Sequence, residues 1–213
     1  MKRLMIFLLA FCFLPLSAQQ TDGGATAIVK DLAKKYEGFS SMKIQYTLKI
    51  EKDKKVLSTS TGNLLLAGNQ YAAEMAGQQL FCDGMTIWNY QPESNEVSIF
   101  NYDPMDEDNM LNPAKILKNW SKIYSAKLIR EELQKNKMIQ IIDLKPLKMS
   151  DVYKIRLFVD KDKKQLTAIA MYETDNTIST YYIDKFVSNA TVVKSQFVFD
   201  VNRHPDAEVN DMR

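Results

Sequence analysis

Side chains that commonly carry catalysis are scarce in this sequence. It has one histidine, His204, which stands beside Pro205 near the end of the chain, and two cysteines, Cys12 and Cys82. A single histidine in that position offers no Ser-His-Asp or Cys-His pair, and no glycine-rich phosphate loop follows a strand. The sequence therefore predicts neither enzymatic activity nor a cofactor.

Long apolar runs are also missing, except for one at the N-terminus. The basic residues Lys2 and Arg3 are followed by an almost unbroken apolar run over residues 4–14, and the bond after Ala18 offers a cleavage point. This order is typical of a secretory signal peptide, and the run is shorter than the roughly 20 residues that a membrane span needs. We expect residues 1–18 to be removed on export and residues 19–213 to form a single domain.

Neither sign of charge dominates the exported part. The whole chain has 28 Lys and Arg against 26 Asp and Glu, and loss of Lys2 and Arg3 with the signal peptide leaves 26 of each. A neutral chain has no basic surface for nucleic acid, so we expect no nucleic-acid partner. Asp106, Glu107 and Asp108 could ligate a cation, but a solvated loop is the interpretation that we favour, and no metal is expected.

Alternating apolar and polar side chains, by contrast, are abundant. Ile44, Tyr46 and Leu48 alternate with polar residues, as in a half-buried strand. Short links such as Asp83-Gly84 favour hairpins, because glycine accepts positive φ, and the polar tail after His204 is expected to be loose. The pattern predicts about eleven strands in an antiparallel meander that curls into an open or closed barrel. Beyond the first, they are expected near residues 56–67, 70–76, 78–82, 85–91, 96–101, 126–134, 138–145, 154–160, 165–173, 177–187 and 195–201.

Two helices are predicted beside these strands. The first spans residues 26–37, with Thr26 as its N-cap and Gly38 at its end. The second begins at Asn112-Pro113, in the middle of the strand series. Its apolar stripe consists of Ile116, Leu117, Trp120, Ile123 and Tyr124.

Several strands are apolar on both faces, as in Leu64-Leu65-Leu66. One face must then line an interior while helices cover the other. From the residues alone, an interior filled by its own side chains is favoured over one that holds a ligand.

The segment between Gly62 and Tyr90 resembles a known family. It reads G-x-L-x-L, a turn, a strand and then D-G-x-x-x-W-x-Y, a pattern similar to that of the outer-membrane lipoprotein carrier (LolA-type) family. The matching positions are Gly62, Leu64, Leu66, Asp83, Gly84, Trp88 and Tyr90. The resemblance extends to Phe197-Val-Phe199 and the charged tail after it.

The resemblance implies a fold and a function. The fold would be mainly β with α: an incomplete antiparallel β-barrel whose helical lid encloses an apolar cavity. The protein would be a monomeric periplasmic carrier that takes acylated lipoproteins from an inner-membrane ATP-driven release complex to an outer-membrane acceptor. Candidate lipid-binding wall residues are Leu64, Leu66, Met75, Leu80, Trp88 and Ile99, and candidate lid residues are Ile116, Leu117 and Trp120.

One departure from the family pattern is visible. Many members have a basic residue followed by proline just after the G-x-L-x-L strand, where the basic side chain helps to hold the lid shut. Here that segment reads Ala67-Gly68-Asn69. An envelope lipid sensor, or a carrier of another lipid on the same fold, is therefore the alternative; a lipid hydrolase or transferase and a structural protein with a filled barrel are the remaining ones.

Overall fold

The chain forms one large sheet that curls but does not close. The computed structural model describes residues 22–75, 77–103, 117 and 120–213. Strands follow the order β12-β6-β5-β4-β3-β2-β1-β11-β10-β9-β8-β7, so that β12 and β7 form its two edges. The strands are β1 (Met42–Lys52), β2 (Lys55–Ala67), β3 (Gln70–Met75), β4 (Gln78–Cys82), β5 (Thr86–Gln91), β6 (Glu96–Asn101), β7 (Tyr124–Gln134), β8 (Lys137–Pro146), β9 (Val152–Asp160), β10 (Gln165–Glu173), β11 (Thr177–Ser188) and β12 (Glu208–Asp211).

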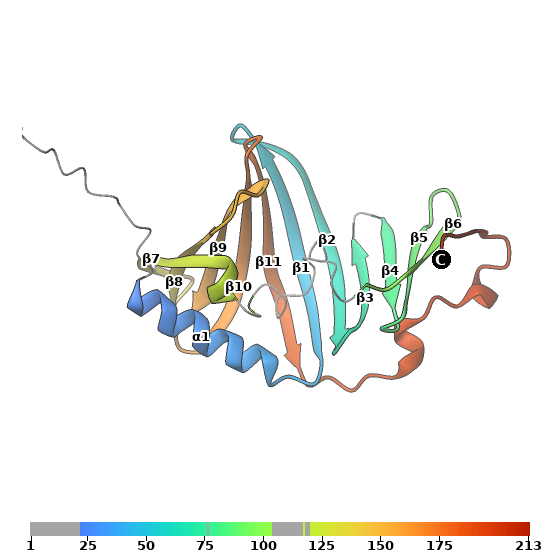
Figure 1. Cartoon of the computed structure of the whole chain (residues 1–213), viewed down its shortest axis with the longest axis horizontal. Helices are drawn as coiled ribbons and strands as arrows, with labels where there is room; N and C mark the ends of the chain where they lie inside the picture. The colour runs from blue at the N-terminus through green and yellow to red at the C-terminus, as the bar shows by residue number, and fades with distance from the viewer. Residues whose placement is uncertain (1–21, 76, 104–116, 118–119) are drawn as a thin grey trace, which may run out of the picture.

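The predicted meander is confirmed over most of its length. Consecutive strands from β1 to β6 and from β7 to β11 pair antiparallel, and β1 joins the two halves by pairing with β11. Tight connections use positive φ, for example 59° at Gly68 and 93° at Gly84. Figure 1 shows the long central strands β1, β2 and β11 between the β7–β9 side and the β3–β6 side of the sheet.

Two predictions about the C-terminal segment are wrong. Residues 195–201 form no strand; they overlap the 3-10 helices η1 (Lys194–Phe197) and η2 (Val201–Arg203). The tail is not loose, because β12 pairs parallel with β6, and Met212 N donates to the carbonyl of Ile99 at 2.9 Å. Phe197 and Phe199 alternate with polar or exposed residues, as strand residues do. Both rings are buried, but neither residue belongs to a strand.

The buried apolar residues form two clusters, one on each face of the sheet. Phe199 lies over the outer face of β4–β6, where Tyr90, Val97 and Ile99 form a second cluster. The Phe199 ring stacks on His204 and lies 4.9 Å from the Tyr90 ring. We call this group the C-terminal cluster. In Figure 1 the segment that carries Phe199 runs beneath β3–β6 before it rises to β12.

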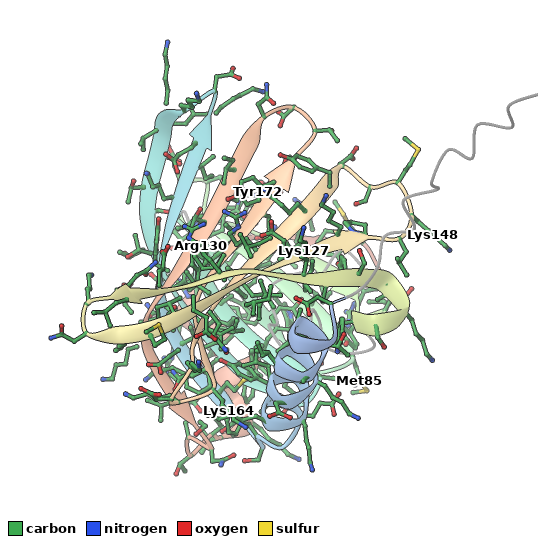
Figure 2. All side chains as sticks on the ribbon, turned by 90° about the vertical axis from the view of Figure 1, so that its left-hand side faces the viewer. Met85, Lys127, Arg130, Lys148, Lys164 and Tyr172 are labelled. Atoms are coloured by element: carbon green, nitrogen blue, oxygen red, sulfur yellow. The ribbon has the colours of Figure 1, made fainter. Side chains whose placement is uncertain are left out.

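The first helix, α1 (Gly23–Glu37), begins earlier than predicted. Its N-cap is Asp22, whose Oδ1 accepts a hydrogen bond from Gly24 N at 2.8 Å, so Thr26 is not the cap. Gly38 ends the helix as predicted. One apolar face, centred on Val29, packs into the larger cluster of buried apolar side chains, which we call the main core. It includes Ile44, Leu64, Trp120, Ile142 and Leu157. Figure 2, seen from the β7 side, shows α1 beneath the β7–β8 hairpin.

The helix predicted at Asn112-Pro113 is only partly within the described residues. Its start and Ile116 lie outside them. Leu117 is helical and α3 spans Trp120–Ile123. Tyr124, which was predicted in the helical stripe, is instead the first residue of β7.

Candidate functional site

The face of β2–β5 that meets the main core is the candidate site. Cross-strand pairing places Leu64, Ala73, Leu80 and Asn89 in one row across these strands. A neighbouring row on the same side contains Gly62 and Met75, which are paired across β2 and β3. We call this side of the sheet the inner face.

Four of the six predicted wall residues share the inner face. Leu64 and Leu66 belong to the main core, and Met75 and Leu80 are half-buried side chains packed against it. The half-buried apolar side chains of the inner face are therefore Met75 on β3, Leu80 on β4 and Ile87 on β5.

The other two predicted wall residues, Trp88 and Ile99, lie on the opposite side of the sheet and do not share a face with the first four. Trp88 pairs with Phe81 and Ile99, and all three face the C-terminal cluster. Side chains alternate along a strand, but the sequence does not reveal which residues of β4 and β5 lie opposite each other across their connection.

Two of the three predicted lid residues pack into the main core. Leu117 and Trp120 are buried in the same cluster as Leu64, and Ile116 lies outside the described residues. Both side chains therefore belong to the core that the inner face adjoins. Whether they move as a lid stays a prediction.

The motif glycine of the inner face has a steric role. Gly62 pairs with Tyr46 of β1. A Cβ built at Gly62 would lie 2.3 Å from Cζ of Tyr46 and 2.7 Å from the backbone oxygen of Glu74. The phenol ring of Tyr46 thus lies directly over β2, in the space that any side chain at position 62 would occupy. This contact explains why the G-x-L-x-L segment begins with glycine in this chain.

Replacing that glycine should destabilise the protein. We expect Gly62→Ala to lower the free energy of unfolding by about 1–3 kcal/mol, because the added methyl group overpacks against a ring and a backbone oxygen. Urea denaturation followed by circular dichroism measures this loss. Gly23→Ala is the matched control, since its Cβ would meet no atom within 4 Å. Equal stability of the two variants would contradict the steric role.

Sequence reasoning missed two polar atoms on the inner face. The Tyr46 hydroxyl and Oδ1 of Asn89 are shielded from solvent and have no hydrogen-bond partner in the described part of the chain. Desolvation, with smaller contributions from Tyr181 and Glu74, raises the pKa of Tyr46 to about 12, so the hydroxyl is neutral at physiological pH. No sequence signal marks these atoms, because their isolation depends on what surrounds them in the folded sheet.

Two further candidate features are the Cys82 thiol and a depression on β1 and β11. The Cys82 thiol is buried and accepts a hydrogen bond from Gly84 N at 3.3 Å. Among the described residues, no three His, Cys, Asp or Glu side chains are grouped as a metal site. A depression of about 190 Å³, lined by Lys43, Gln45, Lys185 and Val187, lies away from the inner face on β1 and β11.

None of the helices formed by the described residues has the length and apolar character needed to span a bilayer.

Comparison with known proteins gives a family and a fold. The sequence model of the family described as outer membrane lipoprotein carrier protein LolA matches residues 37–200. No curated protein matches the chain. The fold is similar to that of an uncharacterized conserved protein from Thermus thermophilus, at 8% identity and a TM-score of 0.57, covering 87% of this chain and 98% of that one.

Two further solved structures are more distant. One is a putative outer membrane lipoprotein-sorting protein domain from Vibrio parahaemolyticus, at 9% identity and a TM-score of 0.44, covering 85% of this chain and 98% of that one. The other is LprF from Mycobacterium bovis, at 10% identity and a TM-score of 0.48, covering 81% of this chain and 96% of that one.

Proposed function

Since the chain belongs to the LolA family of outer membrane lipoprotein carrier proteins, we propose that it is a periplasmic carrier of acylated lipoproteins. It would sequester their acyl chains after release from the inner membrane and deliver them to the outer membrane. The observation that carries the proposal is the inner face, where half-buried Met75 and Leu80 extend the apolar surface of the main core. No bond is made or broken in this function.

Acyl chains must be shielded from water while a lipoprotein crosses the periplasm. Each CH₂ group moved from an apolar environment into water costs about 0.8 kcal/mol, so a chain of about 16 carbons costs on the order of 12 kcal/mol to expose. A protein anchored by such chains does not cross an aqueous space unaided. The proposed partners are therefore an ATP-driven release complex at the inner membrane and an acceptor at the outer membrane.

The β2–β3 turn favours one variation on this function. Gly68 and Asn69 form that turn with positive φ at Gly68, and the carbonyl of Asn69 accepts a hydrogen bond from the Cys82 thiol at 3.7 Å. Neither residue can supply the basic latch that many family members have at this turn. Without that basic residue, closure of the lid must be controlled differently from closure in those family members. A lipid sensor, or a carrier of another lipid, is therefore the second candidate.

A release assay tests the proposal. Purified protein is added to spheroplasts that carry newly made, labelled lipoproteins, and the soluble fraction is examined for a one-to-one complex. A stoichiometric soluble complex is the expected result. Absence of release, together with free lipid bound to the purified protein, would overturn the lipoprotein carrier and favour the second candidate.

A further inference from the structure

Four exposed apolar side chains gather around the connection between β8 and β9. Met149 is fully exposed, and Leu147, Tyr153 and Ile123 are 54%, 48% and 44% exposed. Leu147 and Met149 belong to the connection and Tyr153 follows it in β9. Leu147 N donates to the carbonyl of Ile123 in α3 at 2.8 Å. We call these four residues the apolar tip. Scattered apolar residues are common on protein surfaces, whereas a contiguous group marks a contact site.

A β-bulge turns Tyr153 away from the main core. The consecutive pairs between β9 and β10 are Val152–Glu173 and Lys154–Tyr172, and Tyr153 is the extra residue between them. A bulge re-aims the side chain of its extra residue. The Tyr153 ring therefore lies beside Tyr172, with 6.3 Å between the ring centroids. A tyrosine at the rim of an apolar surface suits the boundary between hydrocarbon and water, because one end of its side chain is apolar and the other is polar.

Lysines surround the apolar tip. They come from α3, from the two strands that the connection joins and from the connection itself, and they are Lys122, Lys145, Lys148 and Lys154. Figure 2 shows Lys148 at the margin of the molecule. Within the described part of the chain, none of the four forms an ion pair with a carboxylate. The connection carries a single acidic residue, Asp151, so positive charge exceeds negative charge around the tip.

Lys154 is held by an aromatic ring rather than by a carboxylate. Its Nζ lies 3.6 Å from the centroid of the Tyr172 ring. The nearby Asp143 is already bound by Arg156, whose Nε and Nη2 donate to its two oxygens at 2.6 and 2.9 Å. Desolvation lowers the pKa of Lys154; Arg156 and Lys145 add to this effect, and Asp143 opposes it. An anion that approaches these groups therefore meets a surface of net positive potential.

The combination favours a bilayer as the partner. The exported chain is neutral as a whole, so the excess of lysine around the tip is local. A protruding side chain such as Met149 finds room in fluid acyl chains, whereas a protein would need a matching pocket. A second copy of the chain is disfavoured by charge, since a two-fold interface would place Lys145 and Lys148 against their own counterparts. Apolar side chains ringed by lysines match a surface of hydrocarbon covered by anionic headgroups.

We propose that the apolar tip and its lysines form a peripheral docking surface for a membrane that contains anionic phospholipid. Leu147 and Met149 enter the boundary between headgroups and acyl chains, Tyr153 lies at the interface, and the lysines contact lipid phosphates. The inference goes beyond the proposed function, because this surface binds the bilayer itself and not a cargo. In Figure 1 the β7–β9 side that carries the tip is separated from β3–β5 by the long central strands.

Sedimentation with sucrose-loaded vesicles tests the inference. The mature protein is mixed with vesicles of phosphatidylcholine alone, or with vesicles of equal parts of phosphatidylglycerol and phosphatidylcholine, and the bound fraction is measured in the pellet. We expect binding to the anionic vesicles, little binding to the neutral ones, and a loss of binding as salt screens the lysines. Equal binding to both kinds of vesicle would overturn the role of the lysines and with it the inference.

One double variant tests the lysines. Lys145→Gln combined with Lys148→Gln should weaken binding to the anionic vesicles roughly 30-fold, because each lysine near an anionic surface contributes about a factor of five. Lys135→Gln combined with Lys137→Gln is the matched control, since these exposed lysines lie at the β7–β8 turn, away from the tip. The control should bind like the unmodified protein.

A second double variant tests the apolar side chains. Leu147→Ser combined with Met149→Ser should weaken binding roughly 10-fold, because less apolar area enters the interface. Val56→Ser combined with Leu57→Ser is its control, since these residues are similarly exposed but lie on β2. Circular dichroism verifies that each variant is folded. Equal binding by the tip variant and its control would overturn the inference.

The remaining outcomes separate this inference from the proposed function. Leu80→Glu alters the inner face and should leave vesicle binding unchanged; a loss there as large as in the tip variant would mean that vesicles bind through the inner face, and would overturn the inference. A protein that binds neither kind of vesicle would also overturn it and leave an acidic protein surface as the partner of the tip. Vesicle binding that depends on the tip, together with failure of the release assay, would support the docking surface and refute the carrier.

Discussion

Leu80→Glu should reduce the affinity for an acyl probe by about 100-fold while the protein stays folded. Leu80 is a half-buried residue of the inner face, so a carboxylate there can remain hydrated in the ligand-free protein. A bound acyl chain would remove that water and leave the charge unpaired, at a cost of several kcal/mol. Calorimetric titration with N-lauroylglycine measures the loss, and circular dichroism verifies the fold.

The matched control is Leu65→Glu. Leu65 is also half-buried, but it points to the opposite side of β2 and pairs with Lys43 of β1. A glutamate there can meet a lysine and should leave binding within about 3-fold of the unmodified protein. Equal losses in both variants, or none in either, would contradict the assignment of the site to the inner face. Leu66 is less suitable for this test, because it is 2% exposed and a charge there would threaten the fold itself.

Phe199→Ala should lower the free energy of unfolding by about 3–5 kcal/mol. The Phe199 side chain is 4% exposed; it holds the C-terminal segment against Phe81 and Tyr90 of the sheet and stacks on His204 within the segment itself. Truncation to alanine removes most of this contact and leaves a cavity over the outer face of β4–β6. Urea denaturation followed by tryptophan fluorescence measures the change, since Trp88 packs against the same cluster.

Val198→Ala is the control for this loss. Val198 directly precedes Phe199 and is 37% exposed, so its truncation should cost less than about 1 kcal/mol. Similar small losses for both variants would mean that the C-terminal segment does not unfold together with the sheet.

Local chemistry allowed the strands from β1 to β11 to be predicted from the sequence. Positive-φ turn residues such as Gly84, Asn136 and Asn176 mark hairpin connections, and alternation marks the strands between them. The C-terminal segment could not be predicted in this way, because Phe197 and Phe199 alternate like strand residues although neither belongs to a ladder. The parallel pairing of β12 with β6 depends on the path of that segment and leaves no local signal.

The candidate site was predictable in part. Leu64, Leu66, Met75 and Leu80 share a face because the short β2–β3 and β3–β4 turns fix the register between their strands. Trp88 was grouped with Leu80 because the sequence does not show which residues of β4 and β5 are paired. In the structure Trp88 pairs with Phe81, so it points to the opposite side from Leu80. The unpartnered atoms of Tyr46 and Asn89 are a property of tertiary packing and could not be read from residue type.

The pairing of β1 with β11 has a consequence for the order of folding. Residues 42–52 meet residues 177–188 in the middle of the sheet, whereas the hairpins on either side form between neighbours in sequence. Closing so long a loop is slow compared with forming a hairpin. Since the chain is made from its N-terminus, the backbone N–H and C=O groups on one edge of β1 stay unpaired until β11 has been synthesised. Exposed strand edges recruit other chains, so we expect this interval to be when the chain is most vulnerable to aggregation and most dependent on chaperones.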